Sequence, residues 1–227
     1  MKKLMMIAAM LVATVSAYAQ FEPGTFSIQP KVGINLAKVS NMPKFTDTYA
    51  NKTVDRTLLG GAVIGAEAEY QIAKPFSVAA GLNFSMQGCQ WEDYDYTDAA
   101  GIKYEEKDNK IELNYLNIPV VANFYLFKGF AVKAGVQMGF LLSAKTKGTE
   151  IIDKKSTTNV DVDVKDYCNK VDFSIPVGVS YQVPTIPIYI DARAIFGLKD
   201  IIKDVPSDAK NFKNQVFQLT VGYKFKL

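Results

Sequence analysis

The sequence predicts an all-β protein, an eight-stranded antiparallel up-and-down transmembrane β-barrel. Three observations lead to this fold class. Eight segments alternate apolar and polar residues, the connections between them alternate in length, and glycines recur on the polar side of the segments. Successive side chains of a strand point to opposite faces, so each segment has one apolar and one polar face.

The first three segments are Phe26–Val39, Leu58–Ile72 and Phe76–Gln90. Each carries an apolar residue at every second position over most of its length. These rows are Ile28, Val32, Ile34 and Leu36, then Ala62, Ile64, Ala66, Ala68 and Tyr70, then Val78, Ala80, Leu82, Phe84 and Met86. Polar residues and glycines fill the positions between them, which predicts strands with one face toward an apolar medium.

The fourth and fifth segments, Glu112–Phe127 and Phe130–Lys145, form the longest predicted hairpin. Their apolar rows run over about 11 residues, near the length that a tilted strand needs to cross a bilayer. Apolar positions are odd-numbered up to Tyr115 and even-numbered from Leu116, which indicates a slip in the strand. Pro119 cannot donate a ladder hydrogen bond, so a bulge or irregularity is expected beside it.

The last three segments are Val171–Val183, Ile188–Leu198 and Gln215–Leu227. The sixth has Phe173, Ile175, Val177 and Val179 on its apolar face, and the eighth continues this alternation to Leu227. Pro176 lies within the sixth segment and predicts a second local irregularity, for the same reason as Pro119.

The connections sort by length. Three are short, namely Ala73–Pro75, Lys128–Gly129 and Pro184–Pro187, and four are long, namely Ser40–Thr57, Trp91–Ile111, Thr146–Lys170 and Lys199–Asn214. Short turns on one side and long loops on the other are typical of bacterial outer-membrane barrels. Both ends of the barrel domain would then lie on the periplasmic side.

Two of the long connections have patterns of their own. Trp91–Lys110 is rich in acids and is expected to be a solvated loop. Its Asp93, Asp95 and Asp98 lack the spacing of a calcium-binding loop, so no metal site is expected. In the next long connection, residues 159–164 alternate and predict a hairpin that extends above the membrane.

Residues 1–19 are expected to be a signal peptide and residues 20–227 the barrel domain. Lys2 and Lys3 precede an apolar run from Leu4 to Val15, and Ala17 and Ala19 provide a small-residue cleavage site. The apolar run is too short for a membrane helix. Without Lys2 and Lys3, 26 basic residues become 24 against 23 acidic ones, a balance that predicts no nucleic-acid partner.

A soluble periplasmic barrel that binds a ligand would show the same alternation, with its apolar face inside. The glycines favour the membrane alternative. Gly33, Gly65, Gly81, Gly135 and Gly178 all fall on the polar face, where a solvated surface would be expected to carry Lys, Glu or Thr. A narrow barrel interior has room for glycine, so the apolar face is expected to meet lipid.

Five motifs stand out along the predicted strands, namely Pro30–Leu36 (PKVGINL), Tyr115–Pro119 (YLNIP), Ala134–Leu142 (AGVQMGFLL), Asp172–Gly178 (DFSIPVG) and Gly222–Leu227 (GYKFKL). In the order and spacing of these motifs, the chain resembles the PorT-like outer-membrane β-barrel family of Bacteroidetes. The resemblance implies a barrel in the bacterial outer membrane. It implies no single activity, because members of the family differ in role.

Chemistry of the usual catalytic kinds is not expected. The sequence contains no histidine, the commonest general base of hydrolases and the commonest transition-metal ligand. The protein is therefore expected not to be an enzyme and to need no cofactor and no metal. Cys89 and Cys168 are the only cysteines, and whether they form a disulfide is left open by the sequence.

Eight charged residues have the parity of the barrel interior. They are Lys31, Glu67, Glu69, Lys133, Asp172, Asp191, Arg193 and Lys224. Buried ions are costly unless they are paired, so four residues of each sign predict salt bridges. These bridges would fill the interior of an eight-stranded barrel, although a gated ion path remains an alternative.

The sequence thus favours a non-enzymatic integral outer-membrane protein with a structural or interaction role. Its extracellular loops would meet partners that the sequence does not identify. The alternatives are a narrow porin-like channel for small solutes and, third, a soluble periplasmic barrel. The expected partners are outer-membrane lipid and, during biogenesis, the barrel-insertion machinery, which commonly reads an aromatic C-terminal residue that Leu227 replaces here.

Overall fold

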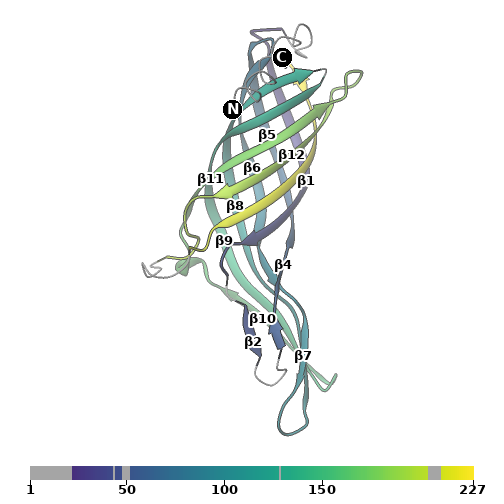
Figure 1. Ribbon diagram of the computed structural model, residues 1–227, viewed down its shortest axis with the longest axis vertical. Coiled ribbons are helices and arrows are strands. Elements are labelled where there is room, and N and C mark those ends of the chain that lie inside the picture. Colours follow the sequence, from purple (N-terminus) through teal and green to yellow (C-terminus); the bar gives the residue numbers. More distant parts are fainter. Residues whose placement is uncertain (1–21, 43, 48–51, 128, 204–210) are drawn as a thin grey trace, which may run out of the picture.

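Eight strands close into a barrel in the computed structural model, which describes residues 22–42, 44–47, 52–127, 129–203 and 211–227 (Figure 1). The ring consists of β1 (Phe26–Val39), β5 (Leu59–Ala73), β6 (Phe76–Trp91), β8 (Lys103–Phe127), β9 (Phe130–Ile152), β11 (Val171–Gln182), β12 (Ile188–Gly197) and β13 (Asn214–Tyr223). Each strand pairs antiparallel with the next, and β13 pairs with β1 to close the ring. The predicted fold class is confirmed.

Short additional elements decorate this ring. β14 (Phe225–Lys226) pairs with the start of β1, and β4 (Arg56–Thr57) pairs with the end of β6. β2 (Phe45–Asp47) and β3 (Lys52–Val54) form a separate two-stranded sheet. A short 3-10 helix, η1 (Lys165–Tyr167), precedes β11. No helix in the described part of the chain has the length and hydropathy to cross a membrane.

β8 and β9 run much farther than predicted. The sequence suggested that they end at Glu112 and Lys145, but they continue to Lys103 and Ile152 and remain paired. β7 (Tyr94–Thr97) pairs with the far part of β8, and β10 (Ser156–Asp163) pairs with the far part of β9. Residues 94–110 and 146–163 thus form a four-stranded sheet, here called the arm, that projects beyond the ring (Figure 1).

The prediction of a solvated acidic loop at Trp91–Lys110 is therefore wrong in part. Part of this segment forms the strands β7 and β8 rather than a loop, and Asp95 pairs with Lys103 across the sheet, although both side chains remain about half exposed to water. The predicted hairpin at residues 159–164 is confirmed as part of β10. The expected signal peptide, the turn residue Lys128 and parts of two long connections lie outside the described residues.

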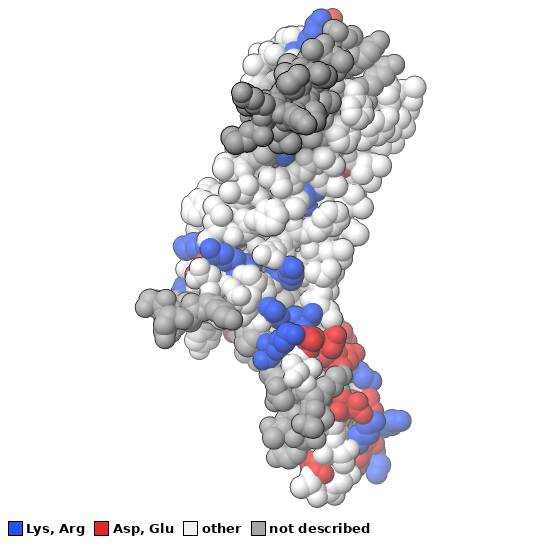
Figure 2. Space-filling model, viewed as in Figure 1, with Lys and Arg blue, Asp and Glu red and all other residues white. Residues whose placement is uncertain are grey.

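The two faces of the ring differ as the alternation predicts. Outward side chains such as Val32, Ile64 and Val136 are exposed, at 59%, 58% and 63%, whereas inward ones such as Asn35 and Asp191 are fully buried. Figure 2 shows the wall of the barrel almost free of Lys, Arg, Asp and Glu. An exposed apolar wall around a polar interior fits a barrel in lipid and not a soluble barrel, because lipid replaces the missing outer core.

The two prolines interrupt the hydrogen-bond ladders without shifting them. The pairing of β6 with β8 goes from Ala80–Val120 to Asn83–Asn117 in the same register, and Pro119 lies in the gap. The pairing of β9 with β11 skips Pro176 in the same way. The irregularity was predicted correctly, but neither proline makes a bulge. Each proline lacks the backbone N–H that would donate to the ladder, and the register on both sides of it is unchanged.

The slip predicted at Tyr115 does not occur within β8 itself. Odd-numbered residues of β8 point inward on both sides of this position, from Leu113 through Tyr125. The change in pattern arises because the interior itself becomes apolar near the mouth of the barrel. A register shift does occur nearby, where Asn114 pairs with Ser143 and Tyr115 with Leu141, so β9 carries the extra residue.

Candidate functional site

Arg193 lies at the centre of the barrel interior and binds two carboxylates. Its Nη1 and Nη2 atoms donate to the two oxygens of Glu67, both at 2.8 Å. Its Nε and Nη2 atoms donate to Asp191, at 2.7 and 3.0 Å. Both contacts have the two-pronged geometry that makes guanidinium–carboxylate pairs strong. Because β12 and β5 are not neighbours in the ring, the Arg193–Glu67 pair spans the interior.

Two lysines complete this group, here called the central cluster. Lys31 of β1 donates to Glu67, and Lys133 of β9 donates to Asp191. The central cluster thus contains three cations and two carboxylates, and all five side chains are buried. Asp191 and Arg193 contact each other as well as residues on other strands.

A second pair lies nearer the periplasmic end. The Nζ atom of Lys224 is 2.7 Å from an oxygen of Glu69 and 3.1 Å from the hydroxyl of Tyr125. Tyr125, Ser77 and Gln29 also donate hydrogen bonds to Glu69. These three neutral donors were not singled out from the sequence. Their interior parity was visible, but their common height in the barrel depends on strand stagger, which sequence does not provide.

Asp172 is separate from both groups. It is buried near the mouth of the barrel, and one of its carboxylate oxygens has no hydrogen-bond partner among the described residues. The nearby amide of Asn214 donates to the hydroxyl of Tyr115 at 3.4 Å. Of the eight predicted interior charges, the structure therefore brings seven into two groups and leaves this one apart.

Glycines make room for the large charged side chains. A Cβ atom at Gly81 would lie 2.6 Å from the Cγ atom of Glu67, and one at Gly178 would lie 2.9 Å from the Cα atom of Arg193. Both distances are shorter than carbon–carbon contact allows. The glycines on the interior face, which oriented the strands in the sequence, are therefore positions where neighbouring strands and their side chains approach closely.

The interior leaves little empty space around these groups. Beside Glu69, Tyr125 and Lys224 the cavity measures about 10 Å³, no more than the space for one water molecule. Toward the mouth, an apolar cluster fills the barrel, formed by Val39, Met42, Cys89, Leu113, Tyr115, Leu141, Ala144, Cys168 and Ile201. Polar packing and apolar packing thus follow each other along the barrel axis.

Cys89 and Cys168 both belong to this apolar cluster, but they are free thiols. The disulfide that the sequence left open is not formed in the structure. Cys168 lies outside the strands, and its backbone forms an isolated antiparallel β-bridge with that of Ile202. Burial raises the pKa of its thiol, so this cysteine is held in the protonated, less reactive form.

The arm carries charges of a different kind. Lys107 and Glu105 are paired at 2.8 Å on its surface, and this contact lowers the pKa of Glu105 and raises that of Lys107. The rings of Tyr96 and Tyr104 stack at 4.8 Å between centroids, and Tyr94 stacks on Tyr96 at 6.2 Å. Among the described residues, no group of acids and cysteines has the arrangement to hold a metal ion.

Comparison with known proteins identifies the type of barrel. A family model described as outer membrane protein beta-barrel domain matches residues 18–203. A search of curated proteins found no match. Among solved structures, the chain is similar to the attachment invasion locus protein Ail of Yersinia pestis, with 11% identity and a TM-score of 0.43 over 89% of this chain and 99% of Ail.

Two other solved barrels are similar to the same extent. Neisserial surface protein A is 13% identical, with a TM-score of 0.44 over 88% of this chain and 97% of that one. The outer membrane protein OprG from Pseudomonas aeruginosa is 13% identical, with a TM-score of 0.41 over 90% of this chain and 97% of OprG. At these identities the likeness does not indicate what this chain binds.

Proposed function

This chain belongs to the outer membrane protein beta-barrel domain family and is an integral protein of the bacterial outer membrane, and we propose that it is a non-enzymatic, closed barrel that acts through its arm. The observation that carries the proposal is the filled interior. The central cluster crosses the barrel, and the apolar cluster fills the mouth. Eight-stranded barrels have just enough interior for side chains, so little is left for a solute path.

The carboxylates of the interior are poorly suited to catalysis. Glu67 and Asp191 each receive hydrogen bonds from Arg193 and from a lysine, so neither has a free oxygen pair for a substrate. General acid–base catalysis needs a group that can change its protonation state in reach of a substrate. The sequence also has no histidine. These features support a structural role for the cluster.

The arm supports an interaction role. All eight residues of β10 are exposed, and within the described part of the chain this strand pairs only with β9. An unpaired strand edge can receive an extended segment of another protein through main-chain hydrogen bonds. The partner of the arm would then be recognised by its backbone, with the exposed Val160 and Val162 adding apolar contact.

We further propose that the chain is of the PorT-like type found in Bacteroidetes, inserted by the outer-membrane barrel-insertion machinery. The motifs at Pro30–Leu36, Tyr115–Pro119 and Asp172–Gly178 support this assignment. In the structure these motifs belong to β1, β8 and β11, where they supply residues of the interior.

Conductance in planar bilayers tests the closed barrel. The purified protein, shown to be folded by heat-dependent gel mobility, should give no reproducible current steps. A large open porin measured in the same bilayers is the positive control. Regular current steps from the folded protein would overturn the closed barrel and favour the narrow channel.

Proteolysis of intact cells tests the position of the arm. Lys154 and Lys155 lie in the exposed turn between β9 and β10, whereas Lys74 lies in a short turn at the opposite end of the barrel. Trypsin added outside the cells should cut after Lys154 or Lys155 and leave Lys74 intact. Cleavage at Lys74 with protection of the arm would place the arm in the periplasm.

A further inference from the structure

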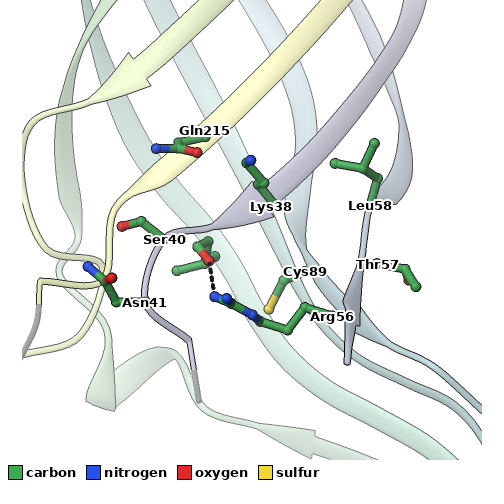
Figure 3. A pocket seen from close by; sticks show the side chains of 9 residues that line it. Lys38, Ser40, Asn41, Arg56, Thr57, Leu58, Cys89 and Gln215 are labelled. Carbon is green, nitrogen blue, oxygen red and sulfur yellow. Dashed lines mark hydrogen bonds between the residues drawn. The ribbon is translucent and has the colours of Figure 1, made fainter. Parts of the chain in front are cut away.

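Two cavities adjoin near the mouth of the barrel, one at its rim and one on its outer wall. One, here called the rim pocket, has a volume of about 570 Å³ and lies at the end of β1 (Figure 3). The other, here called the wall groove, has a volume of about 370 Å³ and lies on the outside of β1, β12 and β13. Lys38, Leu58 and Gln215 line both, so the two cavities form one continuous depression.

The wall groove is apolar and faces the membrane. Leu36, Phe196 and Phe217 line it, and they are 37%, 47% and 49% exposed. Ala194 forms part of its floor, where a small side chain leaves space between larger neighbours. A groove of this kind on a lipid-facing wall accepts a hydrocarbon chain, because a chain that fits into it gains contacts that a flat wall does not offer.

The rim pocket is positively charged. Lys38 and Arg56 line it together with apolar side chains such as Leu58, and no acidic side chain is among the described residues of its lining. Arg56 donates one hydrogen bond, at 3.5 Å, to the carbonyl oxygen of Val39, as Figure 3 shows. That contact uses one of the five N–H groups of a guanidinium. Both cations are thus available to an anion, and phosphate oxygens are the acceptors that such groups bind best.

More cations surround the mouth at the same end of the barrel. Lys170, Lys199 and Lys213 lie within two residues of the mouth ends of β11, β12 and β13. Figure 2 shows Lys and Arg gathered where the apolar wall meets the arm. With the arm outside the cell, as proposed above, this is the level of the lipid headgroups in the outer leaflet, where basic side chains attract anionic lipids.

We propose that the rim pocket and the wall groove together bind one phosphorylated lipid of the outer leaflet. The phosphate lies at Lys38 and Arg56, and one acyl chain lies along Leu36, Phe196 and Phe217. The order of the two cavities supports this occupant. The apolar groove lies on the membrane-spanning wall and the cationic pocket lies beyond the strand ends, which is the order of chain and headgroup in the leaflet.

The test is lipid binding by the full-length folded protein, measured by native mass spectrometry with purified lipid A as the probe. One molecule should remain bound, and the double variant Lys38→Gln/Arg56→Gln should bind at least about tenfold more weakly, a loss of about 1.4 kcal/mol. The matched control is Lys74→Gln/Lys226→Gln at the other end of the barrel, which should bind like the wild type. Equal weakening by both double variants would show diffuse charge attraction and would overturn the site.

The groove needs its own variant. Ala194→Trp should fill the wall groove and weaken binding, whereas Ala66→Trp, on the outward face of β5, should not. Dephosphorylated lipid A should bind much more weakly than lipid A, and inorganic phosphate should not compete at the same concentration. Equal binding of the dephosphorylated lipid, or competition by phosphate alone, would show that one half of the site is not used, and either result would overturn the proposal.

A fluorescence measurement provides a second readout. Trp91 is the only tryptophan of the chain, and it pairs with Arg56 across β6 and β4. Its emission should shift when lipid A binds to the wild type and should not shift for Lys38→Gln/Arg56→Gln. Binding without any shift at Trp91 would place the lipid elsewhere on the barrel.

Discussion

The interior of the barrel and the arm both contain lysine–carboxylate pairs, but the two sets of pairs differ in their exposure to water and in how much the fold depends on them. In the central cluster Glu67, Asp191 and Arg193 are at most 2% exposed, whereas Lys103 and Asp95 on the arm are about half exposed. Water screens the pairs on the arm and can replace either partner. Inside the barrel the packed side chains leave little room for water, so each charge depends on its protein partner.

The largest effect is expected from Glu67→Gln. This change leaves Arg193, Lys31 and Lys133 facing the single carboxylate of Asp191, so the central cluster gains an uncompensated positive charge. Breaking a buried pair in this way costs about 3–5 kcal/mol. Urea unfolding of the protein in lipid vesicles, followed by gel mobility, measures the loss.

A rescue variant separates charge imbalance from simple loss of packing. Adding Lys31→Met to Glu67→Gln restores the original excess of one cation over carboxylates, so the double variant should be more stable than Glu67→Gln alone. If the two losses simply add, the charge balance of the cluster is not what stabilises the interior.

A smaller effect is expected from Lys224→Met. Glu69 loses its cation but keeps the hydrogen bonds from Tyr125, Ser77 and Gln29. With three donors left, the loss should be about 1–3 kcal/mol, the cost of an incompletely satisfied buried group. The same urea titration measures it, and a loss as large as that of Glu67→Gln would mean that the neutral donors contribute nothing.

The smallest effect is expected on the arm, from Lys107→Gln. Contact with Lys107 keeps the pKa of Glu105 low, so its carboxylate stabilises the fold above its ordinary pKa and loses that contribution as the pH falls through the lowered value. Lys107→Gln should raise the pKa of Glu105 toward its ordinary value in an NMR titration. The urea midpoint should not change measurably, because Lys107 is 44% exposed and Lys103 remains 3.9 Å from Glu105.

The sequence was sufficient for the strands and their faces. An alternation of period two gives the inward and outward residues directly, so all eight predicted interior charges are buried. Sequence could not show which charges pair, because that depends on the tilt and stagger of strands that are far apart in the chain. Arg193 and Glu67 are 126 residues apart, and nothing in the alternation places them at the same height.

The arm was missed for a different reason. Residues 103–110 and 146–152 continue β8 and β9 without an apolar face, because both faces of the arm meet water. The alternation of apolar and polar residues therefore gives no strand signal there. The apolar mouth was misleading in the opposite way. Leu113 and Tyr115 face inward like the polar Asn117 and Asn123 that follow them, so the change in chemistry along this face imitated a slip in the strand.

Closure of the ring has a consequence for the order of folding. The pairing of β1 with β13 joins Lys31 to Gly222 and therefore closes almost the whole chain into a loop, whereas the hairpins with short turns form from neighbouring residues. In an open sheet β12 and β5 lie apart, and Arg193 cannot reach Glu67. Closure of the ring therefore removes the open strand edges and also brings Arg193 to Glu67. The barrel gains this contact across its interior only when no strand edge is left for another protein to pair with.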